Sequence, residues 1–129
     1  MNGERQPSHA IDAYKEIIDQ LVTETSHGVS ERLVSEIGIF SKAPGQEKFN
    51  SFVQSLSSEQ RTTLAEMLHR ERTSAIHDVL AVFTWWATAR DLAFQYRSES
   101  MPIGFEGGLH LDYVGRLNDW QWPKDPGGR

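Results

Sequence analysis

The stretch SEQRTTLAEMLHRERTSAIHDVLAVFTWWATARDLAFQY, residues 58–96, decides the fold because it contains neither Pro nor Gly. Its apolar residues keep one angular phase at about 3.6 residues per turn: Leu64, Leu68, Ile76, Val79, Phe83, Trp86 and Ala93. Ser57 and Gln60 have the Ser-x-x-Gln form of a capping box at its start. We predict one long central helix or two nearly collinear helices, with any break near Thr73.

Shorter helical patterns flank this segment on both sides. They cover residues 9–25, 30–40, 49–56 and 109–117, where apolar residues recur three and four positions apart. A loop rich in Gly and Pro follows Arg97, and we expect Trp120 and Trp122 to pack back on the domain. No alternating run indicates a sheet. The predicted fold is all-α: a single-domain helical bundle (1–129) around one long central helix, with a loop-rich C-terminal cap and flexible ends at 1–7 and 124–129.

Composition limits the functional classes. The chain has 129 residues, a net charge of −5 and no Cys. The acidic balance argues against nucleic-acid and anionic-membrane binding, and the lack of Cys excludes disulfides and thiolate chemistry. The most apolar run, residues 75–89, is shorter than the roughly 20 residues of a membrane span. We expect a soluble, cytoplasmic protein that does not enter the membrane.

Two short patterns suggest alternative functions. The sequence from Gly28 through Ser30 to Ser35 resembles the turn of helix-turn-helix DNA-binding repressors, but Glu31 and Glu36 would repel phosphates. Glu24-x-x-His27 and Glu66-x-x-His69 have the spacing of di-iron helical bundles. The bridging carboxylates of such a site are not evident, and Glu66 lies well away from the apolar stripe. We therefore expect no metal or cofactor, and keep Glu66 and His69 as metal candidates of low priority.

His77 and Asp78 lie within the most apolar part of the chain. His77 projects opposite the predicted core stripe, on a face shared with the small residues Ala81, Thr84 and Thr88. Such a face can admit another helix or leave a shallow groove. A structural hydrogen-bonding role is the first interpretation of His77, and a site role is the alternative.

Arg90 is the charged residue that the apolar stripe reaches after Val79, Phe83 and Trp86. A guanidinium there must extend to solvent or find a carboxylate, because an unpaired buried charge is costly. We expect an ion pair with Asp112 or Glu106; the alternative is a pocket for an anionic ligand or partner. Arg72 falls in the same stripe.

The second half of the chain resembles small bacterial proteins of unknown function. The resemblance lies in residues 74–80, in Trp85-Trp86, in residues 112–117 and in Trp120-x-Trp122-Pro123. It implies a bacterial origin and supplies no activity. It also suggests that His77, Asp78, Asp112 and Arg116 belong to one feature.

No motif assigns a reaction, so enzymatic activity stays uncertain and the sequence favours its absence. We expect a non-enzymatic binding or regulatory module, such as an inhibitor, adaptor or immunity-type protein, that acts through a protein partner. An acidic surface suits a basic partner. The candidate surface or pocket comprises His77, Asp78, Arg90, Asp112, Arg116 and Trp120. A homodimer is one of the open oligomeric states. The alternatives are a metal-binding protein or enzyme using Glu66, His69 and His77, and a DNA-binding regulator.

Overall fold

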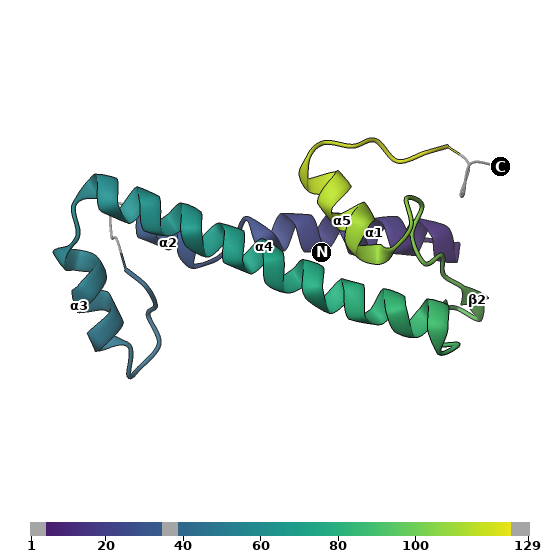
Figure 1. Ribbon diagram of the computed structural model, residues 1–129, viewed down its shortest axis with the longest axis horizontal. Coiled ribbons are helices and arrows are strands. Elements are labelled where there is room, and N and C mark those ends of the chain that lie inside the picture. Colours follow the sequence, from purple (N-terminus) through teal and green to yellow (C-terminus); the bar gives the residue numbers. More distant parts are fainter. Residues whose placement is uncertain (1–4, 35–38, 125–129) are drawn as a thin grey trace. The chain divides into compact units, whose positions relative to one another are not determined.

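A computed structural model describes residues 5–34 and 39–124 of the chain. The elements in chain order are α1 (Ala10–Thr25), α2 (Val29–Val34), α3 (Glu47–Ser55), α4 (Ser58–Ala89), β1 (Gln95–Tyr96), β2 (Glu99–Ser100) and α5 (Leu109–Leu117) (Figure 1). The predicted all-α class is confirmed, with one long helix at its centre. No helix in the described part of the chain is long and apolar enough to cross a membrane.

The described residues fall into two compact units. One combines the described parts of Met1–Val22 and Ile76–Arg129, and the other comprises the described part of Thr23–Ala75. We call them the terminal unit and the middle unit. Each contains its own cluster of buried apolar residues. The single-domain organisation therefore stays a prediction, and the two units are described separately.

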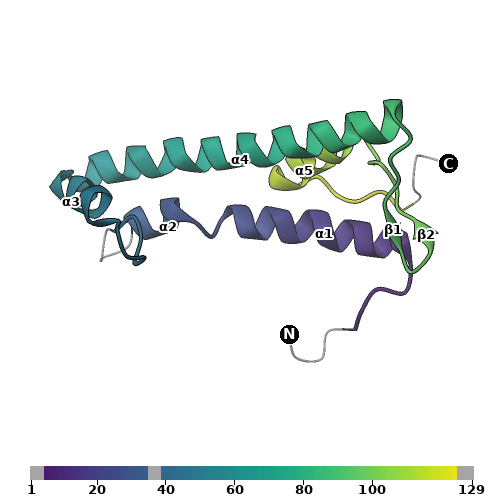
Figure 2. The same ribbon diagram turned by 90° about the horizontal axis from the view of Figure 1, so that it is seen from below.

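The core of the terminal unit forms where α1, α5 and the second part of α4 meet (Figure 2). Its buried members are Tyr14, Ile18, Leu109 and Tyr113. Ile76 and Leu80 of α4 pack against them, together with residues of the loops and of the C-terminal segment. The prediction that α5 spans 109–117 and turns Leu109 and Tyr113 inward is confirmed.

The middle unit has a smaller core, formed by Leu33 of α2, Val53 of α3 and Ala65 of α4. The predicted capping box opens α4: the Gln60 N–H donates to Ser57 Oγ (3.1 Å), and the Ser57 N–H donates to Gln60 Oε1 (2.9 Å). The helix is continuous through Thr73, so the alternative of a break there is wrong.

The predicted end of the central helix is also wrong, because α4 ends at Ala89 and not near Tyr96. Asp91 has a positive φ of 58°, and the Leu92 N–H returns to the Trp86 carbonyl at 3.1 Å. The Trp86 carbonyl also accepts the Arg90 N–H at 3.0 Å, so it receives two donors where the chain reverses.

A short β-hairpin follows this reversal. Gln95 pairs with Ser100 and Tyr96 with Glu99 in antiparallel register. The turn residues Arg97 and Ser98 both have positive φ, 49° and 70°, as a two-residue hairpin turn of the right twist requires. The sequence did not predict this hairpin, because each strand has only two residues and the turn contains no Gly or Asn.

The predicted flexible ends are residues 1–7 and 124–129. Of these, residues 1–4 and 125–129 lie outside the described residues. In the remaining part of the leader, the Pro7 carbonyl accepts a hydrogen bond from the Tyr96 hydroxyl (2.7 Å), and Gln6 accepts one from Arg97 (2.7 Å). Residues 6 and 7 are thus tied to the hairpin.

Helix α2 does not extend to Phe40, the predicted end of the helix 30–40. It begins at Val29, one residue before the predicted cap Ser30, and its described part ends at Val34. Ser35, Glu36 and Ile37, on which the longer helix and the DNA-binding alternative depended, lie outside the described residues.

Candidate functional site

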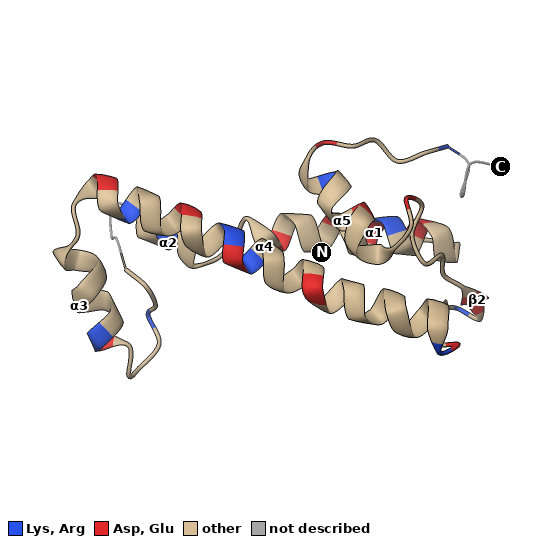
Figure 3. Ribbon diagram, viewed as in Figure 1, with Lys and Arg blue, Asp and Glu red and all other residues tan. Residues whose placement is uncertain are grey.

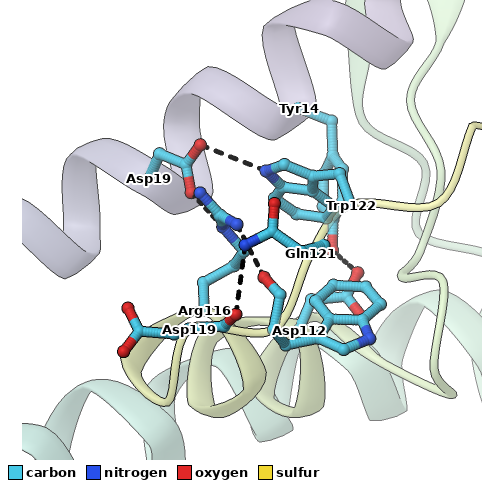
Figure 4. Close-up of polar contacts among 8 residues, drawn as sticks. Tyr14, Asp19, Asp112, Arg116, Asp119, Gln121 and Trp122 are labelled. Atoms are coloured by element: carbon cyan, nitrogen blue, oxygen red, sulfur yellow. Dashed lines mark hydrogen bonds and ion pairs between the residues drawn. The ribbon is translucent and has the colours of Figure 1, made fainter.

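Asp112 organises the polar interior of the terminal unit (Figure 4). It lies in the first turn of α5 and is completely buried. Its Oδ2 accepts hydrogen bonds from the Tyr14 hydroxyl (2.5 Å) and the Phe105 N–H (2.8 Å), and its Oδ1 accepts one from the Glu106 N–H (3.1 Å). Asp112 therefore joins α1, α5 and the Gly-rich loop before α5, and its carboxylate faces no solvent.

Tyr14 responds to this environment. Burial raises the pKa of the Tyr14 hydroxyl well above its usual range, and the hydrogen bond to Asp112 and the charge of that carboxylate raise it further. The hydroxyl is accordingly a proton donor that stays protonated at neutral pH. It serves as a structural partner of Asp112.

Arg116, one turn beyond Asp112 on α5, connects the C-terminal segment to α1. Its Nε donates to Asp19 Oδ1 (2.6 Å), and its Nη1 donates to the Trp120 carbonyl (2.6 Å). The Trp122 indole N–H donates to the other oxygen of Asp19 (3.1 Å). Figure 4 shows the Arg116 side chain and the Trp122 ring converging on Asp19. The C-terminal segment is thereby fixed on α1.

The two C-terminal Trp residues pack back on the unit, as predicted. The Trp122 ring lies 5.9 Å from the Tyr14 ring and 5.3 Å from the Phe105 ring, measured between centroids. Trp120 lies against Gly115, where a Cβ atom would approach its ring to 3.3 Å. Trp120 is therefore a packing residue of the C-terminal segment.

The small-residue face around His77 receives the start of α5. The Leu109 N–H donates to Thr84 Oγ1 at 3.0 Å, so a side chain of α4 caps α5. A Cβ atom at Gly108 would lie 2.9 Å from Thr84 Cγ2, so this approach needs glycine. The His77 ring stands edge-on to the His110 ring, with centroids 5.1 Å apart. The sequence predicts that this face either admits another helix or leaves a shallow groove. In the structure α5 packs there.

Arg90 does not form the expected ion pair. It is exposed, and its guanidinium lies over the Trp85 ring, 5.2 Å from the centroid. In the described part of the chain neither Asp112 nor Glu106 pairs with it, because both Asp112 oxygens accept hydrogen bonds from Tyr14 and the loop. The physical reason is that Arg90, directly after α4, continues the exposed face of that helix.

The six candidate residues therefore have different neighbours. Asp112, Arg116 and Trp120 join α5 to α1 and to the C-terminal segment. His77 contacts His110 and also lies 3.1 Å from Asp78, measured from Nδ1 to Oδ1. Arg90 stacks on Trp85.

The metal candidates lie in the middle unit. His27, Glu31, Glu66 and His69 line one open hollow beside α2 and α4. His27 Nδ1, in the turn before α2, lies 3.2 Å from Glu31 Oε2 of α2, and both side chains are exposed. Within residues 5–34 and 39–124, no group of three or more His, Asp or Glu side chains is placed to hold a metal ion.

Three residues of the predicted apolar stripe, Val79, Phe83 and Trp86, are exposed, contrary to the prediction, whereas Ile76 of the same stripe packs against the core. Val79, Val82, Phe83, Trp85 and Trp86 are 55%, 56%, 42%, 50% and 48% exposed. We call these five residues the α4 strip. The core side of α4 is instead formed by Ile76, Leu80 and Thr84. Thr84 is small enough for α5 to approach closely, whereas indole and phenyl rings are not.

No charged side chain interrupts the α4 strip. Residues 79–89 contain no charged residue, with Asp78 just before them and Arg90 just after (Figure 3). Large exposed apolar patches on a soluble protein mark interaction sites. The apolar spacing of the sequence predicts Val79, Phe83 and Trp86 of this strip as core residues and does not include Val82 and Trp85.

An apolar pocket adjoins the strip, because Phe83 lines both. The pocket has a volume of about 230 Å³. Its walls come from α1, α4, α5 and the hairpin region: Tyr14, Ile17, Ile18, Leu80, Phe83, Phe94, Gln95, Met101, Pro102 and Leu109. Gln95 is the one amide among these side chains, so the pocket suits an apolar group.

Comparison with known sequences gives a family and no activity. The profile of a family of unknown function (DUF6547) matches residues 7–124. The predicted resemblance to a family without assigned activity is thus confirmed, but it extends over nearly the whole chain and not the second half alone. No curated protein and no solved structure matches the chain.

Proposed function

Since the chain belongs to the family of unknown function DUF6547, its role must be inferred from its own surface, and we propose that it is a non-enzymatic protein-binding module. The observation that carries this proposal is the α4 strip, five large apolar side chains about half exposed on one helix. Val79, Val82, Phe83 and Trp86 follow the i, i+3, i+4, i+7 spacing by which a helix presents one face to a partner.

The size of the strip supports specific but modest binding. Three half-exposed aromatic residues and two valines offer on the order of 400 Å² of apolar surface. At about 25 cal/mol per Å², burying this surface contributes about 10 kcal/mol before the cost of association. That cost is about 4–15 kcal/mol, so the strip alone supports weak binding and flanking contacts must contribute.

Residue types at the strip also fit protein recognition. Trp and Phe are enriched at the energetic centres of interfaces, and charged residues are depleted there. Arg90 at the end of the strip adds a cation that stacks on Trp85. The proposal includes the regulatory roles expected from the sequence (inhibitor, adaptor or immunity-type protein) and a cytoplasmic, bacterial setting.

A photo-crosslinking amino acid at Val82 tests this proposal in cells. We expect a covalent adduct between the full chain and a second polypeptide after irradiation, and no adduct from the same amino acid at the exposed Glu16 of α1. The mass of the adduct shows whether the partner is another protein or a second copy. Equal labelling from both positions, or none from Val82, would contradict the proposal.

The pocket beside the strip favours a second candidate function, the binding of a small apolar molecule. Its volume of about 230 Å³ exceeds that of cavities which bind benzene, about 150 Å³. We expect indole or hexanol to raise the melting temperature of the protein. An Ile17→Trp variant, which fills the rim, should lose this shift, and an unchanged shift would contradict this second candidate.

A further inference from the structure

We propose that the occupant of the α4 strip is a second copy of this chain, docked antiparallel on α4 with the twofold axis beside Val82. This inference rests on the proposed function and names the partner. A twofold interface places the same surface of both copies face to face, so the surface must complement itself. The α4 strip meets that condition in its apolar residues and in its charges.

The helical spacing divides the strip into a centre and two edges. At 100° per residue, Val82 lies near the middle, Asp78 and Trp85 lie on one edge, and Val79, Phe83 and Trp86 lie on the other. In an antiparallel pair, equal edges meet at positions about equally far from the axis, here about three and four residues on either side of Val82. Val79 of one copy then faces Trp86 of the second copy, and Asp78 faces Trp85.

Charge decides between the antiparallel and the parallel order. By helical spacing Arg90 follows Val79, Phe83 and Trp86, but its guanidinium lies over the Trp85 ring, 5.2 Å from the centroid, and so next to the edge that carries Asp78. The Asp78 side chain is 77% exposed. The antiparallel order brings Arg90 and Trp85 of one copy to Asp78 of the second copy, so that a guanidinium and an indole N–H meet a carboxylate. The parallel order would bring opposite edges together, so that Asp78 of one copy would face the Val79 and Trp86 edge of the second copy without a cationic partner.

The area of the strip is sufficient for a weak dimer. Two strips bury on the order of 800 Å² together, from the half-exposed rings and valines. The flanking residues Asp78, Ala89 and Arg90 bring the total to about 1,000 Å², the lower limit of specific interfaces. We therefore expect a dissociation constant in the micromolar range, on the order of 1–100 μM.

Sedimentation velocity of the full chain, from about 1 μM to several hundred μM, tests self-association. We expect a concentration-dependent shift from monomer to dimer. Val82→Glu should remain monomeric over this range with an unchanged circular dichroism spectrum. A wild-type protein that is monomeric throughout, or a Val82→Glu variant that still dimerises, overturns the inference. In the first case a Val82 adduct with another protein would still support the proposed function.

Charge reversal and crosslinking test the antiparallel order. We expect Asp78→Arg and Arg90→Asp each to weaken the dimer about tenfold, and the double variant to recover most of the affinity. Because the chain lacks Cys, single introduced thiols report contacts without background. A short bismaleimide should join Asp78→Cys to Trp85→Cys in a mixture and leave Asp78→Cys alone unlinked. Efficient linking of Asp78→Cys to Val79→Cys, which the parallel order would bring together, would overturn the inference.

Discussion

Asp112 shows how a single carboxylate can determine local structure. Backbone N–H groups of Phe105 and Glu106 must point inward to reach it, and the Gly-rich loop allows this path. Gly104 has a φ of 104°, and a Cβ atom there would lie 2.5 Å from the Gly108 backbone. The loop, α1 and α5 are therefore held by one buried group that accepts three hydrogen bonds.

Replacing Asp112 by Asn should destabilise the terminal unit. In either orientation the amide group turns an NH₂ toward a donor, so at least one buried donor loses its acceptor. We expect the free energy of unfolding to fall by about 2–3 kcal/mol in urea titrations. The exposed acid Asp119 offers a matched control, since Asp119→Asn should change stability by less than about 0.5 kcal/mol. Equal effects of the two variants would contradict the role of Asp112.

Stability should also fall at alkaline pH because of Tyr14. The pKa of its hydroxyl is raised in the folded protein above the ordinary value of 10.0. The folded state therefore holds this proton more tightly, and its stabilising contribution is complete below pH 10 and declines as pH rises above 10. We expect a loss of about 1.4 kcal/mol per pH unit there.

The Tyr14→Phe variant isolates this effect. Other groups titrate in the same range, so the slope of stability against pH must be compared between wild type and variant. We expect a shallower slope above pH 10 for Tyr14→Phe, whatever its stability at neutral pH. Identical slopes would show that Tyr14 does not cause the alkaline loss.

At the residue scale the grouping suggested by the resemblance stays a prediction. The resemblance grouped His77, Asp78, Asp112 and Arg116, and three of these four lie on α5 or contact it. Their partners could not be predicted, because Tyr14 and Asp19 are almost a hundred positions away in the chain. Pair contacts over such separations leave no periodic signal in one sequence.

At the scale of elements, the sequence predicted correctly those helix bounds and caps that depend on interactions between neighbouring residues. The capping box at Ser57 and the helices 9–25 and 109–117 agree with the structure within one residue. The predicted orientation of the second part of α4 was wrong, because periodicity shows that a helix has an apolar face but does not show what covers that face. Here α5 packs on the small residues, and the larger apolar face is exposed.

The end of α5 offers a prediction at this scale. Asp119 has a φ of 62°, the Asp119 N–H donates to the Arg116 carbonyl (3.3 Å), and the Trp120 N–H donates to the Gly115 carbonyl (2.9 Å). This is a Schellman motif, whose left-handed position favours Gly. We expect Asp119→Gly to raise the free energy of unfolding by about 0.5–1 kcal/mol, and we expect Asp119→Ala to lower it. A stabilising Ala variant would contradict this geometry.

For the whole molecule, two helices belong to both compact units. Helix α1 (Ala10–Thr25) and helix α4 (Ser58–Ala89) each continue across the division at Val22 and at Ala75. Helix propagation is cooperative, so melting one part of a continuous helix weakens the part beside it. The predicted single domain therefore implies that the two units unfold together. A mutation in one unit tests this when the unfolding of the other unit is measured.

Leu33→Ala is that mutation, because Leu33 is completely buried in the middle unit and its truncation should cost about 2–5 kcal/mol. All four Trp residues, Trp85, Trp86, Trp120 and Trp122, belong to the terminal unit, so Trp fluorescence reports that unit alone. Far-ultraviolet circular dichroism reports the helices of both units. If α1 and α4 couple them, Leu33→Ala lowers the urea midpoint equally by both methods. A fluorescence midpoint that stays at the wild-type value, beside an earlier dichroism transition, would show two independent domains.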